Sequence, residues 1–380
     1  MRVIHIIKMT GLAGAENHLL VLLSGLRARG IDARFLVMVT PENPVTALDA
    51  AAAARDIPVA RLVIRHHADL TVYPRLWRRL RALKPDIVHT HLQHGDLYGI
   101  PAARLAGVPV VITSRHNDDI RRRHPALRVL NRALWGMVDA GITISDAIGR
   151  FSIEVEGASP QKVQTIHYGL EDMPPGSDRA EARAALRGEL GLTDDTLLAG
   201  IVARLIPVKG IPYALKAMRQ IASRFPTAHL LIVGDGPLRS ELEAETAALS
   251  LADRVHFLGW RQDVPQIMAG LDVLLMPSLR EGFGLSMLEA MGQGVPIIGS
   301  AVSAIPEVIA DGETGLLCPA RDVDALAAAM AKLLTDPALR ERMGAAGRAR
   351  LEAHFRAERM VNETAALYER LLAAKKAAAG

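Results

Sequence analysis

The sequence is poor in the residues that several protein classes require. It has one cysteine, Cys318, in 380 residues, which excludes a disulfide scaffold and a zinc module built on cysteines. Aromatic residues make up 4% of the chain, too few for a platform that stacks single-stranded nucleic acid. No apolar run reaches the roughly 18 residues of a membrane-spanning helix. We therefore expect a cytoplasmic protein that binds no nucleic acid, with Cys318 as a buried structural thiol.

Hydrophobic residues, by contrast, make up 50% of the chain and charged residues 23%. This balance excludes a disordered chain, and the length suffices for two or three domains. The charge is unevenly distributed: residues 1–170 contain 22 Lys and Arg against 14 Asp and Glu, whereas the other 210 residues contain 23 against 27. A basic first half and an acidic second half indicate separate domains with separate partners.

Short apolar runs alternate with longer stretches of helical spacing along the whole chain. The expected strands are 3–7, 33–39, 87–89, 110–113 and 141–144 in the first half, and 198–202, 229–233, 255–258, 273–276 and 296–299 in the second. Such alternation predicts an α/β protein with open parallel sheets and helices on both faces. The proline-rich stretch 168–177 has no periodicity and is interpreted as the linker between two doubly wound domains.

The segment with the most pronounced pattern leaves the strand 273–276 and enters a helix through a glycine-containing loop. Backbone amides of residues 284–286 at the helix N-terminus favour an anion. Glu281 and Glu289 flank these amides, and since carboxylates repel a phosphate, they suit the neutral hydroxyls of a sugar better. For an isolated pair of glutamates, a capped helix with two solvated carboxylates is the simpler interpretation.

Three elements in the same order resemble retaining GT-B glycosyltransferases of the family 4 type. Glu281 and Glu289 resemble the EX7E motif of that family, and Arg204 with Lys209 resembles its Arg-x4-Lys-Gly element. The third element is the turn Gly234-Asp235-Gly236-Pro237. Similar elements run from residue 11 to about residue 319, which is most of the chain.

The resemblance implies a GT-B fold, in which two Rossmann-like domains face a central cleft. Residues 1–170 would form the acceptor-binding domain and residues 171–356 the nucleotide-sugar-binding domain, with a C-terminal helix at about 357–375 packing back on the first. The implied activity is retaining transfer of a hexose from a nucleotide diphosphate sugar to a hydroxyl acceptor. UDP-sugars are favoured over GDP-sugars, and lipid-linked alcohols and cell-envelope glycans are candidate acceptors.

No metal or other cofactor is expected, because fixed cations can stabilise the charge that develops on a pyrophosphate leaving group. The resemblance assigns catalytic roles to His116, Arg204, Lys209 and Glu281. It assigns donor binding to Gly14, Arg204, Lys209, Gly234, Trp260, Glu281, Gly282, Phe283, Gly284, Leu285, Ser286 and Glu289. Within that set, Glu289 would hold the ribose hydroxyls and Glu281 the sugar hydroxyls.

Several alternatives remain open at this point. His116 either carries a proton or only positions the sugar, and Trp260 either stacks beside the nucleobase or is buried at the edge of its domain. A non-hydrolysing UDP-sugar 2-epimerase has the same fold, and a non-catalytic module that binds sugar nucleotides is a third possibility. An epimerase would form its product without an acceptor, and turnover would exclude the module.

Two patterns could indicate a metal site. His89 and His91 would share one face of a strand, with His94 close in sequence, but no acidic or cysteine ligand stands nearby. Asp322 and Asp324 imitate the D-x-D motif of metal-dependent transferases, yet an acid at the start of a helix is an ordinary N-cap. We therefore predict no metal site, and a capping role for Asp322.

Basic residues form two groups in the first half of the chain. Arg75, Arg78 and Arg79 recur along an amphipathic helical stretch, and residues 121–123 are three consecutive arginines, Arg121, Arg122 and Arg123. A basic amphipathic face attracts anionic lipid, which would place the protein at the inner face of the plasma membrane. The alternative is an ordinary solvated helix surface.

Overall fold

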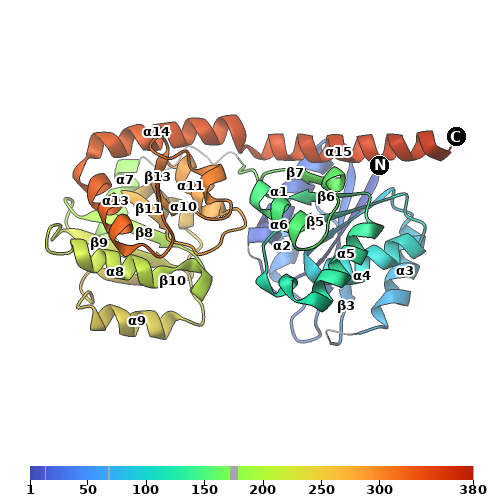
Figure 1. Ribbon diagram of the computed structural model, residues 1–380, viewed down its shortest axis with the longest axis horizontal. Coiled ribbons are helices and arrows are strands. Elements are labelled where there is room, and N and C mark those ends of the chain that lie inside the picture. The colour runs from blue at the N-terminus through green and yellow to red at the C-terminus, as the bar shows by residue number, and fades with distance from the viewer. Residues whose placement is uncertain (13, 67–68, 172–178, 380) are drawn as a thin grey trace. The chain divides into compact units, whose positions relative to one another are not determined.

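The computed structural model describes residues 1–12, 14–66, 69–171 and 179–379. The chain forms two compact units (Figure 1). The N-terminal unit comprises Met1–Glu171 and Ala357–Gly380, and the C-terminal unit comprises Asp172–Arg356. The chain therefore passes between the units twice, after residue 171 and after residue 356.

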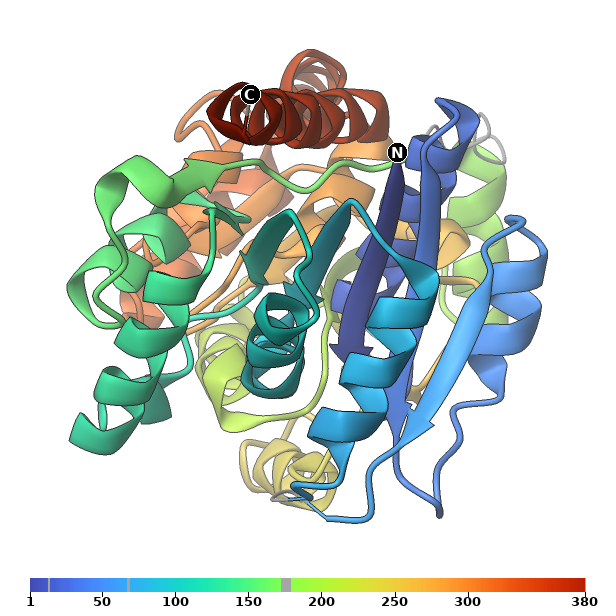
Figure 2. The same ribbon diagram turned by 90° about the vertical axis from the view of Figure 1, so that its right-hand side faces the viewer.

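The N-terminal unit contains a seven-stranded, fully parallel sheet in the order β3-β2-β1-β4-β5-β6-β7 (Figure 2). Its strands are β1 (Arg2–Lys8), β2 (Asp32–Val39), β3 (Val59–Val63), β4 (Ile87–His91), β5 (Val110–Arg115), β6 (Ala140–Thr143) and β7 (Val163–Thr165). Its helices are α1 (Gly14–Ala28), α2 (Ala47–Ala53), α3 (Val72–Leu83), α4 (Leu92–Leu105), η1 (Ile120–Arg123), α5 (Pro125–Met137), α6 (Asp146–Glu154), η2 (Pro160–Lys162) and α15 (Ala357–Ala379).

Alternate residues of these strands enter two different hydrophobic cores. On one face, Val3 and Ile7 of β1 pack with α1, α2 and the C-terminal helix α15. On the other face, Ile4 and Ile6 pack with α3, α4 and α5. Burial on both faces explains why the central strands are almost continuously apolar.

The C-terminal unit contains a six-stranded parallel sheet in the order β10-β9-β8-β11-β12-β13. Its strands are β8 (Leu197–Val202), β9 (Ala228–Val233), β10 (Val255–Gly259), β11 (Val273–Met276), β12 (Ile297–Ser300) and β13 (Gly315–Cys318). Its helices are α7 (Arg179–Glu189), η3 (Pro207–Lys209), α8 (Ile211–Ile221), α9 (Arg239–Ala248), α10 (Val264–Gly270), α11 (Leu285–Gly292), α12 (Ile305–Val308), α13 (Val323–Thr335) and α14 (Pro337–His354). Helices α8 and α13 cover one face of this sheet, where they enclose its main hydrophobic core.

The predicted α/β class with two doubly wound sheets is confirmed. The predicted linker is wrong at its start, because Tyr168 is buried in the N-terminal unit with 5% exposure. Residues 169–171 also belong to the N-terminal unit, and residues 172–177 of that stretch lie outside the described residues. The N-cap prediction for Asp322 is confirmed, since its carboxylate accepts a 2.9 Å hydrogen bond from the amide of Ala325.

Cys318 is buried, as predicted. Burial, with the nearby carboxylates of Asp311 and Asp322, raises the pKa of its thiol to about 11. Such a thiol is unreactive at neutral pH. No helix in the described part of the chain is both long and apolar enough to cross a bilayer.

Candidate functional site

In the C-terminal unit, the loops that follow four neighbouring strands are joined along the carboxyl edge of the sheet. The amide of Gly234, after β9, donates to the carbonyl of Gly259, at the end of β10, over 2.8 Å. The amide of Leu205, after β8, donates to the carbonyl of Asp235 over 2.9 Å. The edge of a doubly wound sheet where such loops meet is where its ligands bind.

Two pairs of loops at this edge approach each other so closely that only glycine fits. Gly210 has φ +64°, and a Cβ there would lie 2.0 Å from the carbonyl oxygen of Pro277. Gly234 has φ +127°, and a Cβ would lie 2.0 Å from the carbonyl oxygen of Ala203. Any side chain at either position would push the loops apart.

The glycine-containing loop after β11 leads into α11, as the sequence predicts. Gly284 is the N-cap of α11 with φ +86°, a conformation that other residues rarely adopt. Phe283 is buried, and its ring contacts that of Phe355 edge to face at 5.7 Å. These contacts fix the start of the helix, so the amides of residues 284–286 lie at its N-terminus, in the segment that follows the carboxyl end of β11.

Lys209 and Glu281 form an ion pair in this region. The Nζ of Lys209 lies 2.6 Å from Oε2 of Glu281, and the two side chains are 17% and 11% exposed. The Oγ of Ser278 also donates to this carboxylate oxygen, over 3.3 Å. The backbone supports the pair, because the amide of Leu279 donates to the carbonyl of Val208 over 2.8 Å. Lys209 is thus held by an acid 72 residues away in sequence.

Glu289, in α11, is half-buried. Burial raises the pKa of its carboxyl group. Within the part of the chain that the structure describes, its carboxylate has no hydrogen-bond or ion-pair partner, so its oxygens can accept hydrogen bonds from a ligand.

Arg204 and Trp260 are exposed at the ends of β8 and β10. Trp260 has 70% of its surface exposed, so the interpretation that it is buried at the domain edge is wrong. In the N-terminal unit, Gly14 is exposed and begins α1, in the loop after β1.

His116 lies in the N-terminal unit, immediately after β5, and is buried, with 8% of its surface exposed. Its Nδ1 lies 2.5 Å from the hydroxyl oxygen of Tyr168, and its Nε2 lies 3.1 Å from Nδ1 of His91. Burial, with the charges of Arg115 and Arg122, lowers the pKa of His116 to about 3. Both ring nitrogens of a neutral imidazole are therefore engaged within the unit.

Four histidines, His5, His89, His91 and His116, form a buried group that we call the histidine cluster. Nitrogens of His5, His89 and His91 lie within 4.8 Å of one another, the kind of spacing a metal site has, whereas His94 is not in that group. However, both nitrogens of His89 and both of His91 already have hydrogen-bond partners. A metal ion would have to break these bonds, so the cluster suits hydrogen bonding better than metal ligation.

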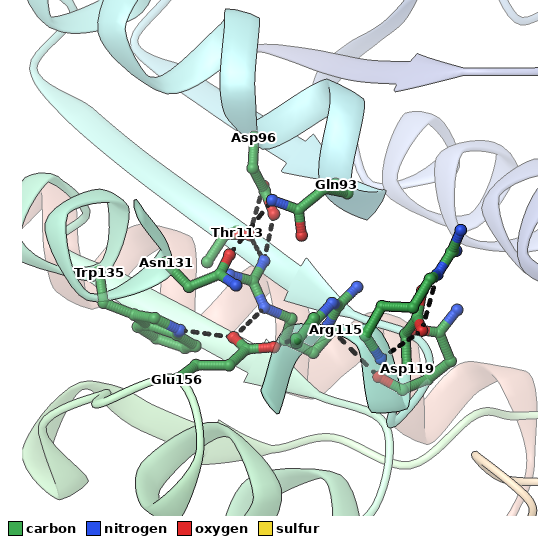
Figure 3. Close-up of polar contacts among 11 residues, drawn as sticks. Gln93, Asp96, Thr113, Arg115, Asp119, Asn131, Trp135 and Glu156 are labelled. Carbon is green, nitrogen blue, oxygen red and sulfur yellow. Dashed lines mark hydrogen bonds and ion pairs between the residues drawn. The ribbon is translucent and has the colours of Figure 1, made fainter. Parts of the chain in front are cut away.

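A buried ion network that the sequence did not predict surrounds Arg115, the residue before His116 in the sequence; Figure 3 shows Arg115 with its partners Asp96 and Glu156. Arg115 contacts the carboxylates of Asp96 and Glu156, and its Nε lies 2.6 Å from Oε2 of Glu156. Arg122 also pairs with Glu156, at 2.7 Å, and the indole of Trp135 donates to it over 2.8 Å. Two cations thus balance two anions, which buried charges require.

This network corrects the prediction that Arg122 belongs to a membrane-facing patch, because only 5% of its side chain is exposed. Its neighbours differ: Arg121 is 83% exposed although it pairs with Asp119, and Arg123 is exposed. The other predicted patch residues, Arg78 and Arg79, are exposed on α3, and Arg75 is half-buried.

The sequence matches two families of known proteins. Residues 182–350 match the glycosyl transferases group 1, and residues 13–169 match the glycosyl transferase 4-like domain. The N-acetyl-α-D-glucosaminyl L-malate synthase of Bacillus anthracis is 30% identical over 297 residues, which cover 74% of each chain. The chain belongs to the group 1 glycosyl transferases.

The names of other members of this family indicate that they act on varied substrates. The 2-deoxystreptamine glucosyltransferase of Streptomyces kanamyceticus is 32% identical over 80% of this chain and 82% of its own. A GDP-mannose-dependent monoacylated α-(1-6)-phosphatidylinositol monomannoside mannosyltransferase of Corynebacterium glutamicum is 34% identical over 67% of this chain and 68% of its own. The family is therefore a family of sugar transferases with diverse donors and acceptors.

Solved structures show the fold to be GT-B. Anabaena HepE in complex with UDP-glucose superimposes with a TM-score of 0.83 at 21% identity, covering 97% of this chain and all of HepE. Sucrose-phosphate synthase of Thermosynechococcus elongatus superimposes with a TM-score of 0.80 at 24% identity, covering 98% of this chain and all of that one.

Proposed function

We propose that this glycosyltransferase is a retaining, metal-independent enzyme that transfers a hexose from a nucleotide diphosphate sugar, with UDP-sugars favoured, to a hydroxyl acceptor. The observation that carries the proposal is the ion pair between Lys209 and Glu281 beside the N-terminus of α11. It brings together, from loops far apart in sequence, a cation suited to a diphosphate and a carboxylate suited to sugar hydroxyls.

The donor would bind at the carboxyl edge of the C-terminal sheet. The amides at the start of α11 would receive the phosphates, and Glu289, which lacks a partner among the described residues, would accept hydrogen bonds from the ribose. Exposed Trp260 presents a face on which a nucleobase can stack. Anabaena HepE, which has the same fold, was solved in complex with UDP, and UDP is the nucleotide that we propose for this chain.

Charge development on the leaving diphosphate would be stabilised by Arg204 and Lys209. Cations fixed in place before the reaction lower the barrier because they need no reorganisation as the glycosidic bond breaks. Two such side chains would supply the charge that a divalent ion supplies in metal-dependent transferases. For this reason we propose that neither a metal nor another cofactor takes part.

The acceptor would bind to the N-terminal unit, which carries the basic excess of the chain. Exposed Arg121 and Arg123 lie in η1, which also contains the exposed Ile120 (56%), and the following helix α5 contains the exposed Val129 (72%). Cations with neighbouring apolar side chains suit the surface of an anionic membrane. A lipid-linked or cell-envelope acceptor at the inner face of the plasma membrane would follow.

A thermal-shift panel tests the donor assignment. Because a ligand that binds only the native state raises the melting temperature, we expect UDP-glucose, UDP-galactose or UDP-N-acetylglucosamine to raise it more than GDP-mannose does. The increase should persist in EDTA and disappear in a Glu289→Gln variant. No shift with any nucleotide sugar would contradict the proposal.

A further inference from the structure

The histidine cluster lies on one face of the N-terminal sheet, and strand register places its members together. His5 of β1 is paired with His89 of β4, and His91 is two residues further along β4, so all three side chains point to the face covered by α1 and α15. Each of the three has 0% exposure. Polar rings buried this deeply are costly unless they are hydrogen-bonded.

One series of hydrogen bonds leads from the cluster to the first connection between the units. Nδ1 of His5 lies 3.0 Å from Nε2 of His91, which is linked through its Nδ1 to His116, and His116 is linked to the hydroxyl of Tyr168. The ring of His18, from α1, stacks on Tyr168 with centroids 3.9 Å apart. Tyr168 is three residues before Glu171, where the chain leaves the N-terminal unit.

A second hydrogen bond leads from the cluster to the other connection. Nδ1 of His89 lies 2.6 Å from the hydroxyl oxygen of Tyr368 in α15, and its Nε2 lies 2.7 Å from Oγ of Ser114. The rings of His89 and His91 are in contact, with centroids 4.2 Å apart. Tyr368 is fully buried, and its helix begins at Ala357, where the chain returns to the unit.

The two connections also meet directly. The amide of Ala357 donates to the carbonyl of Leu170 over 2.8 Å. Arg55, near the C-terminal end of α2, makes a bidentate ion pair with Glu171 at 2.5 and 2.7 Å. The last residues before the first connection and the first residue after the second are therefore held side by side on the N-terminal unit.

We propose that the histidine cluster is an anchor that fastens both chain connections to the N-terminal unit, the first through Tyr168 and the second through Tyr368. Each tyrosine hydroxyl gives a buried imidazole nitrogen a hydrogen-bond partner. Removing a hydroxyl leaves that nitrogen unsatisfied, and the cost of an unsatisfied buried polar group loosens the segment that carries the tyrosine. The anchor does not depend on the sugar-transfer reaction.

Hydrogen exchange of single amides in the full-length protein tests the anchor. Ile166 and Ala357 are the reporters, because their amides donate to the carbonyls of Thr143 and Leu170 next to the two connections. Tyr168→Phe should speed exchange of both amides by about tenfold, and Tyr368→Phe should do so for Ala357. Unchanged exchange of both reporters in both variants would overturn the proposal.

Tyr73→Phe is the matched control. The hydroxyl of Tyr73 donates to the carbonyl of Leu97 over 3.1 Å in the same unit, on the face away from the cluster. This variant loses a comparable hydrogen bond, so it should leave exchange at Ile166 and Ala357 at the wild-type rate. Acceleration equal to that of Tyr168→Phe would show general loosening of the unit and would count against the anchor.

A double-mutant cycle tests whether the cluster acts as one body. Tyr168→Phe and Tyr368→Phe each increase the exchange rate of the Ala357 amide by some factor. In the double variant, the increase should differ from the product of these two factors by about threefold or more, because residues in one network are coupled. For Tyr168→Phe combined with Tyr73→Phe, the increase in the exchange rate of Ala357 should equal the product of the two single-variant factors. If a variant does not fold, NMR of the histidine ring nitrogens in the wild-type protein provides the test. Imidazoles fixed in one neutral tautomer at neutral pH would support the anchor. Charged imidazoles, or imidazoles that exchange between tautomers, would overturn it.

Discussion

The ammonium group of Lys209 lies 2.6 Å from the carboxylate of Glu281, although 72 residues separate them in sequence. Each neutralises the other, which explains how a carboxylate is tolerated next to a proposed phosphate site. A bound diphosphate would compete for Lys209 and leave Glu281 able to accept hydrogen bonds from sugar hydroxyls. The pair therefore gives both residues a stable arrangement before the donor arrives.

Replacing the proposed cations should abolish most of the activity. Arg204→Ala and Lys209→Ala should each lower kcat by about two orders of magnitude or more, because charge stabilisation in the transition state is lost. Lys216→Ala is the control, since Lys216 is a half-exposed lysine of the same unit, 3.7 Å from Glu245. Steady-state assays of nucleotide release measure the effect. A kcat near the wild-type value in either test variant would contradict the proposal that Arg204 and Lys209 stabilise the leaving diphosphate.

The two glutamates of the proposed donor site should affect different ligands. Glu289→Gln should weaken binding of free UDP and of the UDP-sugar alike, because both contain the ribose. Glu281→Gln should spare UDP and weaken the UDP-sugar, because Glu281 would contact only the hexose. Isothermal titration with both ligands measures this difference. Equal losses for both ligands in both variants would contradict the proposed roles.

The central strands of both sheets could be predicted from the sequence, whereas most of the edge strands could not. The expected strands correspond to ten observed ones, and the strands that were not predicted, β3, β7 and β13, are all edge strands. An edge strand has a neighbour on one side only and is less buried: all three residues of β7 are partly exposed. Without a continuous apolar run or strict alternation, these segments carry no clear strand pattern.

Sequence motifs located the candidate donor residues but could not show their pairing. The contact of Lys209 with Glu281, the cluster around His5 and the network around Arg115 all join residues from different strands and loops. Glu156 has 0% exposure, yet a single glutamate in a polar stretch looks like a solvated residue in the sequence. Only the strand order brings such residues together, and motif spacing contains no information about it.

The three consecutive arginines should behave differently when replaced. Arg122→Ala should lower the free energy of unfolding by about 3 kcal/mol or more, because it leaves the buried Glu156 with one fewer cation. Arg121→Ala should have little effect, since Arg121 is 83% exposed. Urea denaturation of both variants measures this difference. A stable Arg122→Ala protein would contradict the structural role of the network.

Membrane association should depend on the exposed residues and not on Arg122. Binding to phosphatidylglycerol vesicles should fall steeply as the salt concentration rises, since the attraction between basic side chains and anionic lipid is screened within about 10 Å at 0.1 M salt. Neutralising Arg121 and Arg123, or replacing Ile120 and Val129 by Ser, should weaken it, and so should neutralising the basic face of α3. Vesicle co-sedimentation measures binding, with phosphatidylcholine as the control. No binding at low salt, with full activity on a soluble acceptor, would contradict the proposal.

The buried histidines should make the N-terminal unit sensitive to mild acid. Burial lowers the pKa of His5 and His116 to about 3, and it also lowers the pKa values of His18, His89 and His91. Because these groups have a pKa near 6.5 in the unfolded chain, their stabilising contribution is complete above pH 6.5 and is lost as the pH falls toward 3.

Each such histidine can lower the free energy of unfolding by up to about 1.4 kcal/mol for each pH unit below 6.5. Urea unfolding followed by fluorescence of buried Trp135, in a variant with Trp77 and Trp260 replaced by Phe, should therefore show stability falling from about pH 6.5 to 5. A free energy of unfolding that stays constant over this range would show that the histidines are not buried as neutral groups.

The most direct test of the proposed function follows the anomeric proton of the sugar by time-resolved NMR. The protein is incubated in EDTA with α-linked UDP-sugars, GDP-mannose and a panel of hydroxyl acceptors. We predict release of UDP together with an α-linked product, formed at the same rate with and without added Mg²⁺. A β-linked product, a sugar nucleotide epimerised without an acceptor, or activity that requires Mg²⁺ would contradict retaining, metal-independent transfer.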